Sequence, residues 1–179
     1  MDDNVIVDTS FTAVINAPIE AVDIPAWCFS LPDVEYQGCS PAHVAAGATT
    51  APDGRRMSIN VEVIGGTPMV QHYVEQEATP HRLVLKSVSD LFTAAGRTTM
   101  VVVWELSVKS LGSGRCEFTN RVHTYPTEEF QAYLDRQGIP FEVFRAGRAP
   151  YSAAHNAGET PLFAASLERF TQRHAAAAA

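Results

Sequence analysis

The chain has 179 residues, of which 46% are hydrophobic and 18% charged, and its 20 acidic residues outnumber its 13 basic ones for a formal charge of -7. This composition is typical of a globular protein and excludes a disordered or collagen-like chain, and the length fits one domain, which we expect to cover residues 1–179. No cluster of Lys and Arg is available to neutralise phosphates, so we exclude nucleic acid as the default partner.

The cysteines and the N-terminus predict the compartment. Cys28, Cys39 and Cys116 are too few for a disulfide framework, and no two of them have the CxxC spacing of a zinc knuckle. The acidic N-terminus lacks the basic and apolar regions of a signal peptide, and no stretch has the roughly 18–20 apolar residues that span a bilayer. We therefore expect a cytoplasmic protein with reduced thiols and no membrane span.

The first two thirds of the chain are predicted to form mainly strands. Residues 5–15 alternate loosely and are rich in Val, Ile, Thr and Phe, which predicts a strand. Pro18 fits the first turn of a helix, and Pro25 then predicts that this helix is short or divided. Between residues 34 and 125, β-branched and aromatic runs alternate with turn signals that leave no room for crossover helices. We place six further antiparallel strands near residues 35–48, 56–64, 68–77, 82–93, 98–109 and 115–124.

The pattern becomes helical after the last predicted strand. Thr127 is a helix cap with acidic residues in the turn that follows, and Gly138 ends this helix. A second helical piece over residues 141–149 is predicted to stop at Pro150, and a last helix to start near Pro161. The interruptions are expected because an interior proline removes a helical N–H and clashes with the preceding turn.

The order of these elements and the entry into the first helix carry a family resemblance. After the first strand, the run Asn16-Ala17-Pro18-Ile19-Glu20-Ala21-Val22 is similar to an Asn-Ala-Pro-x-Glu-x-Val opening that is common in the START/Bet v 1-like (SRPBCC) superfamily. The resemblance implies an α+β helix-grip fold, in which a curved seven-stranded antiparallel sheet surrounds a C-terminal helical segment and an internal cavity. Members include lipid and hormone carriers, coenzyme-Q-binding proteins, and polyketide cyclases and aromatases, and the fold alone does not choose among them.

Alternation along the predicted strands assigns side chains to the inner face of the sheet. The inward sets are Met57, Ile59, Val61 and Val63; Val70, His72 and Val74; Met100, Val102, Trp104 and Leu106; and Cys116, Phe118, Asn120 and Val122. The polar members, His72 and Asn120, need hydrogen-bond partners, which are either other core groups or a ligand. A satisfied core pair is the commoner of these two cases.

Few residues stand out as candidates for chemistry. No phosphate-binding, dinucleotide-binding or hydrolase motif is present. His72 and His155 are the catalytic candidates, and His155 either acts as a general base in the segment that closes the cavity or caps a helix end before Gly158. No two histidines stand at i, i+2 or i, i+4, so we expect no metal and no cofactor, although distant ligands can converge in ways that a sequence does not reveal.

The leading interpretation is a protein that binds a small hydrophobic or aromatic molecule in an internal cavity. The expected ligand-binding residues are Met57, Ile59, His72, Trp104, Phe118, Asn120, Phe141, Phe144 and Phe163. The alternative is an enzyme of the polyketide cyclase or aromatase kind that uses acid/base residues in the cavity, and whether the chain is an enzyme stays open. A third class is an interaction module: Val101 and Val103 lie on the outer face, which is either partly buried or meets a second copy in a homodimer.

Overall fold

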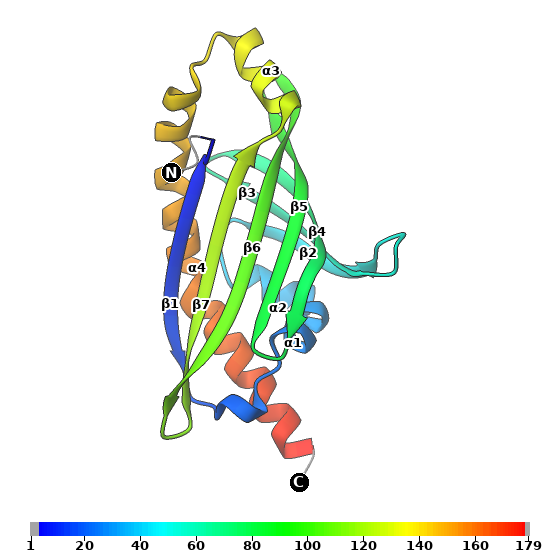
Figure 1. Ribbon diagram of the computed structural model, residues 1–179, viewed down its shortest axis with the longest axis vertical. Helices are drawn as coiled ribbons and strands as arrows, with labels where there is room; N and C mark the ends of the chain where they lie inside the picture. The colour runs from blue at the N-terminus through cyan, green and yellow to red at the C-terminus, as the bar shows by residue number, and fades with distance from the viewer. Residues whose placement is uncertain (1–3, 178–179) are drawn as a thin grey trace.

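Seven antiparallel strands form one open sheet, and a long C-terminal helix lies along its inner face (Figure 1). The computed structural model describes residues 4–177. The strands are β1 (Val7–Ile15), β2 (His43–Thr50), β3 (Arg56–Ile64), β4 (Thr67–Thr79), β5 (Arg82–Thr93), β6 (Gly96–Gly112) and β7 (Arg115–Pro126). The helices are η1 (Ile19–Ala21), α1 (Ile24–Ser30), α2 (Asp33–Gln37), α3 (Glu128–Gln137) and α4 (Phe141–Ala177). The order across the sheet is β1-β7-β6-β5-β4-β3-β2, which confirms the predicted α+β class and the seven-stranded antiparallel sheet.

The segment before β2 differs from its prediction. Residues 35–48 were expected to form one strand, but the first residues of that range belong to α2 and the strand begins at His43. Acidic residues in the first turn of α2 favour the helix, since they face its positive dipole end. The Asp33 carboxylate also accepts a hydrogen bond of 2.7 Å from the backbone N–H of Ala46, which fastens α2 to β2.

The C-terminal segment is one continuous helix, so the interruptions predicted at Pro150 and Pro161 are wrong. Each proline removes its own N–H from the helical hydrogen bonds and crowds the preceding turn, yet the helix continues past both positions. Beside Pro161, the Thr160 hydroxyl donates to the carbonyl of Asn156 at 2.5 Å. Figure 1 shows α4 changing direction part-way along its length, as a helix with interior prolines does. The helix α3 begins at its Thr127 cap and ends at Gly138, as predicted.

The inward face of the sheet follows the predicted alternation in β6 and β7 but not in β3 and β4. Met100, Val102, Trp104 and Leu106 are buried, as are Cys116, Phe118 and Asn120. In β3 and β4, by contrast, the buried alternation consists of Ser58, Asn60, Glu62 and Ile64, followed by Met69, Gln71 and Tyr73. The apolar set that was expected inside, including Met57 and Ile59, lies on the outer face. Met57, Ile59 and Val61 are half-buried there, where cross-strand pairs such as Ile59 with His72 cover one another, and Val63 is exposed.

Aromatic side chains pack the core where α1 and α4 meet the sheet. The Trp27 ring makes edge contacts with Phe118 and Phe163. Its indole Nε1 donates to the Ser166 hydroxyl at 2.9 Å, so the one polar atom of this buried ring is satisfied. None of the helices within residues 4–177 is long and apolar enough to cross a membrane.

Candidate functional site

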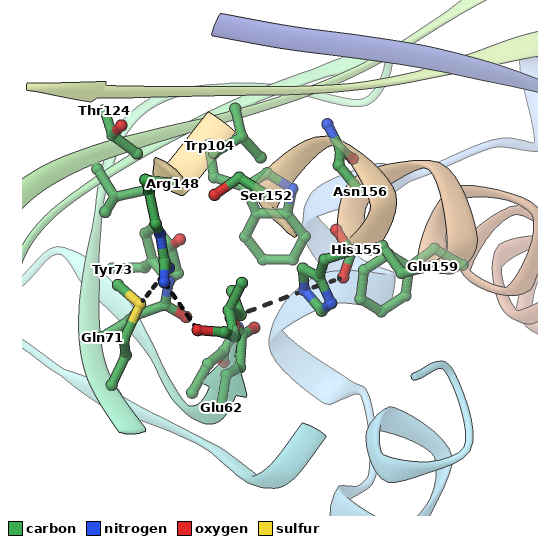
Figure 2. A pocket seen from close by; sticks show the side chains of 16 residues that line it. Glu62, Gln71, Tyr73, Trp104, Thr124, Arg148, Ser152, His155, Asn156 and Glu159 are labelled. Atoms are coloured by element: carbon green, nitrogen blue, oxygen red, sulfur yellow. Dashed lines mark hydrogen bonds and ion pairs between the residues drawn. The ribbon is translucent and has the colours of Figure 1, made fainter. Parts of the chain in front are cut away.

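A small pocket, which we call the inner pocket, lies between α4 and the inner face of the sheet, with a volume of about 40 Å³ (Figure 2). One wall is apolar and includes Val102, Trp104, Val122 and Phe163. The polar part of the lining includes Glu62, Gln71, Tyr73, Arg148, His155 and Glu159. The inward-facing polar residues of β3 and β4 therefore supply much of the polar lining of the pocket.

Two histidines and two glutamates converge at one end of the pocket. They come from three elements: His43 from β2, Glu62 from β3, and His155 and Glu159 from successive turns of α4. The Glu159 carboxylate lies 3.0 Å from His43 Nε2 and 3.1 Å from His155 Nε2. The Glu62 carboxylate is 3.7 Å from His43 Nε2 and 3.8 Å from His155 Nε2. Side-chain exposure is 0% for His43 and only 11% for His155, the most exposed of the four, so the cluster is almost free of solvent.

Burial and mutual contacts set the protonation of this cluster. Burial, reinforced by the negative charge of Glu159, raises the pKa of the Glu62 carboxyl. Burial would also raise the pKa of Glu159, but hydrogen bonds from His155 and His43 outweigh it and lower that pKa to about 2. Burial acts to lower the pKa of His155, yet its hydrogen bond to Glu159 raises the pKa above the usual value. The contact between His155 and Glu159 thus favours the charged form of each group, whereas burial disfavours the charged form of Glu62.

Arg148 is a buried cation in the same polar lining. Its guanidinium donates to the backbone carbonyl of Ile64 at 2.7 Å and contacts the Met69 sulfur at 3.0 Å. Among the residues that the structure describes, no carboxylate forms an ion pair with it, and burial lowers its pKa while the charge of Glu62 acts in the opposite direction. In Figure 2 the side chain extends from α4 toward Tyr73, while His155 approaches Glu62 from the other side.

A second, larger hollow lies on the other side of Arg148. It has a volume of about 260 Å³ and lies under α3 and the first turns of α4, against aromatic residues that include Phe130, Tyr133 and Phe144. Arg148 lines both this outer groove and the inner pocket. The guanidinium therefore stands at the boundary between an apolar groove open to the surface and a polar interior.

Comparison with known proteins bears on the fold. No family model and no curated protein sequence matches the chain. Among solved structures, the Zhui aromatase/cyclase from Streptomyces sp. R1128 is similar with a TM-score of 0.60 at 9% identity, over 94% of each chain. A START superfamily protein from Mycobacterium smegmatis is similar with a TM-score of 0.52 at 17% identity, over 93% of this chain and 97% of that one. The chain has the START/Bet v 1-like fold.

A di-domain protein shares this fold in part. The di-domain ARO/CYC StfQ from the steffimycin biosynthetic pathway is similar with a TM-score of 0.60 at 11% identity. The match covers 97% of this chain and 53% of that one, so the present chain spans about half its length.

The START/Bet v 1-like fold brings together some of the residues that the sequence singled out. Trp104, Phe163 and His155 line the inner pocket, and Phe144 lines the outer groove. Phe118 and Asn120 are fully buried in the core, and Asn120 joins the Trp104 indole Nε1 (2.8 Å) to the Glu159 carboxylate (3.0 Å). Phe141 is half-buried and packs against the core.

Three of the expected pocket residues face the wrong way. Met57, Ile59 and His72 lie on the outer face of β3 and β4, so their expected orientation toward a cavity is wrong. The prediction placed the apolar alternation inside because burial favours apolar side chains. Here the polar residues of β3 and β4 can lie inside because they form hydrogen bonds and ion pairs with one another and with side chains of α4.

Sequence reasoning missed His43, Glu62, Arg148 and Glu159. One signal was present, because Glu159 follows His155 at i, i+4 and so lies on the same helix face. Ser58, Asn60 and Glu62 also repeat at strand spacing, which marks a polar face. Nothing in the sequence places His43 beside them, since that contact depends on how β2 lies against α4.

Proposed function

We propose that this protein binds a small molecule with an apolar or aromatic body and an anionic or oxygen-rich end. The observation that carries the proposal is Arg148, a buried guanidinium that lines both the inner pocket and the outer groove and has no carboxylate partner among the described residues. A buried charge of this kind is costly unless it is paired, so a ligand oxygen would supply the missing partner.

The dimensions of the two hollows support this proposal. The inner pocket alone, at about 40 Å³, holds only a few atoms. Movement of the Arg148 side chain would join it to the 260 Å³ groove and give a space near the lower end of small-molecule sites, which begin at roughly 300 Å³. The ligand body would then contact Phe130, Tyr133 and Phe144, and its polar end would meet the guanidinium.

A second candidate function is catalysis of the aromatase or cyclase kind. The specific observation in its favour is the His155–Glu159 pair, which lines the pocket and holds an imidazole against a buried carboxylate. Such a pair can give and accept protons at a bound carbonyl compound. The names of two structural neighbours, an aromatase/cyclase and a di-domain ARO/CYC, point the same way, although the likeness shows the fold alone.

Calorimetric titration with a matched ligand pair tests the binding proposal. Naphthoate carries a carboxylate, and naphthylmethanol offers the same ring without the charge. We expect saturable binding of naphthoate, with a preference over the alcohol of about tenfold or more, corresponding to about 1.4 kcal/mol. Arg148→Met should abolish that preference.

The control is Arg145→Met, which removes an exposed guanidinium on the preceding turn of α4 that pairs with Glu142. It should leave both affinities unchanged. If neither ligand binds saturably, or if Arg148→Met binds naphthoate as tightly as the unaltered protein, the proposal is wrong. Native mass spectrometry of protein purified from cells then gives the identity of any retained molecule.

A further inference from the structure

The four side chains of the His–Glu cluster direct one ligand atom each toward a common point. These atoms, two imidazole nitrogens and two carboxylate oxygens, all lie within 4.8 Å of one another. Zinc bonds of about 2.0–2.2 Å in a tetrahedral arrangement separate the ligand atoms by about 3.4 Å. Glu159 Oε2 is 3.0 and 3.1 Å from the two Nε2 atoms, and the nearer Glu62 oxygen is 3.7 Å from His43 (Oε1) and 3.8 Å from His155 (Oε2), so these distances bracket that separation.

Each of the two imidazoles is oriented by its other ring nitrogen. His43 Nδ1 is 2.7 Å from the backbone carbonyl of Tyr36, which can only accept, so Nδ1 carries a proton and Nε2 faces the cluster. His155 Nδ1 is 3.2 Å from the Ser40 hydroxyl, which leaves its Nε2 for the cluster as well. Metal-binding histidines are usually held in this way.

Each carboxylate is oriented by outer partners too. Glu159 Oε1 accepts from the Asn120 amide at 3.0 Å, which leaves Oε2 for the two imidazoles. Glu62 accepts from the Tyr36 hydroxyl. When the Gln71 amide nitrogen faces Glu62, it donates to Oε2 at 3.2 Å while the amide oxygen accepts from Tyr73 at 3.0 Å. All four ligands are therefore preorganised by a second set of hydrogen bonds.

Acceptor atoms and negative charge gather at the centre of the cluster. His43 Nδ1 is held at the Tyr36 carbonyl, so Nε2 is the ring nitrogen that faces a Glu159 oxygen 3.0 Å away. Two nearly solvent-free carboxylates add negative charge to the same place. A proton on an imidazole Nε2 bridges one nitrogen–oxygen pair, whereas one divalent ion would bind all four ligand atoms at once.

We propose that His43, Glu62, His155 and Glu159 form a binding site for a divalent transition-metal ion. Two imidazoles argue against Mg²⁺ and Ca²⁺, which prefer oxygen, and the absence of sulfur ligands from this set argues against Cu(I). A closed set of two nitrogens and two oxygens suits Zn²⁺ best. Glu62, His155 and Glu159 also line the inner pocket, so the ion would lie at its wall, within reach of a bound molecule.

The test uses the full chain, freed of metal with a chelator and then titrated with Zn²⁺ and Co²⁺. We expect one Zn²⁺ per chain by elemental analysis, a rise in the thermal midpoint on adding Zn²⁺, and Co²⁺ absorption bands of four- or five-coordinate intensity. His155→Gln and Glu62→Gln should each weaken Zn²⁺ binding by more than the roughly 10- to 100-fold that loss of an outer partner costs, because each removes a direct ligand. The matched control is His72→Gln, which removes an imidazole on the outer face of β4 and should leave binding unchanged.

Two results would overturn the proposal. One is the lack of stoichiometric binding of both ions to chelator-treated protein whose circular dichroism shows it to be folded, which would leave a proton-sharing network as the role of the cluster. The other is unchanged Zn²⁺ affinity in both cluster variants, which would place the ion elsewhere. If a variant fails to fold, the Co²⁺ spectrum of the unaltered protein decides, since an octahedral spectrum of surface-bound ion excludes the site. Failure of naphthoate binding leaves this result unaffected, because the two proposals rest on different residues.

Discussion

The Asn120 side chain links two buried side chains of the candidate site. Its side-chain oxygen accepts from the Trp104 indole at 2.8 Å, and its nitrogen donates to Glu159 at 3.0 Å. It is fully buried and lies on β7 between the apolar wall and the His–Glu cluster. Because both partners are buried as well, neither can turn to water when the amide is lost.

We therefore predict that Asn120→Ala lowers the free energy of unfolding by about 3 kcal/mol, because it leaves two buried groups unpaired. Urea unfolding followed by circular dichroism measures this. The control is Thr119→Ala on the opposite face of the same strand, which should change stability by less than about 0.5 kcal/mol. Equal stability of the two variants would show that the Trp104 and Glu159 contacts do not stabilise the fold.

The residues also show where sequence reasoning succeeds. Trp104 and Phe163 were expected at a cavity, and both line the pocket, because long apolar strands and helices bury their large side chains. His72 was expected there and lies outside, because β4 presents its polar alternation inward. Hydrophobicity alone cannot tell which alternate residues of a strand face inward where a buried polar network takes the place of apolar side chains.

At the scale of elements, Glu35 joins α2 to α4. Its carboxylate accepts from the Ser166 hydroxyl at 2.7 Å and from Arg169 at 2.8 Å. Burial acts to raise the pKa of Glu35, but these two hydrogen bonds, together with the charges of Arg169 and Arg173, lower it below its usual value. Since the folded-state pKa is the lower one, the stabilisation is present at neutral pH and is lost as the pH falls through that value.

Glu35→Gln should therefore lower the free energy of unfolding by about 1 kcal/mol at neutral pH, and the difference from the unaltered protein should shrink as the pH falls below about 4.3. Urea unfolding over a series of pH values measures this. Glu20→Gln, an exposed change in η1, serves as the control and should have no effect. A stability difference that stays constant down to low pH would show that the charge of Glu35 is not what joins the helices.

The turn between β3 and β4 contacts the first part of α4 through a glycine. Gly65 has a φ of 59°, and a Cβ placed there would lie 2.9 Å from the Tyr151 ring. Its neighbour Gly66 has a φ of 78°, but a Cβ at that position would have no atom within 4 Å of it. The two glycines thus share a left-handed backbone and differ in what surrounds them.

We predict that Gly66→Ala costs about 1 kcal/mol through backbone strain alone, and that Gly65→Ala costs about 1 kcal/mol more because it displaces Tyr151. Thermal unfolding compares the two. In a Tyr151→Ala background the excess cost of Gly65→Ala should fall, because the ring is removed and only the Cβ contact at 3.1 Å remains. If the excess persists undiminished without the tyrosine ring, the contact between the turn and α4 is not its cause.

At the scale of the whole molecule, stability is expected to be uneven along α4. In its first turns, over residues 141–151, most side chains are exposed and Pro150 lacks an N–H. Further along, Phe163 and Leu167 are buried against the sheet. The outer groove lies under the first part, so local opening there would admit a ligand while the sheet stays intact.

Hydrogen exchange should show amides of residues 144–151 exchanging at least about tenfold faster than those of β6. Amides of residues 163–171 in the same helix are the internal control and should be protected like the sheet. Uniform protection along α4 would mean that ligand entry needs a different route.

The number and order of the strands were more predictable from the sequence than the contacts between distant elements. Turn signals and strand-like runs defined the seven strands, because an antiparallel meander is built from local hairpins. The continuity of α4 was not predictable, because tertiary packing against the sheet outweighs the local cost of Pro150 and Pro161. The meeting of His43 with His155 depends on that packing and so could not be predicted either.

The placement of His155 and Glu159 on successive turns has a consequence for how α4 docks. Apolar contacts alone would tolerate a helix sliding along the sheet by one turn, about 5.4 Å, since small and large apolar residues recur along it. The same slide would carry Glu159 away from both His43 and Asn120 and leave three buried polar groups unsatisfied. The cluster therefore disfavours slipped positions of α4 on the sheet. It favours the one alignment in which the apolar and the polar lining residues of the pocket face the same space.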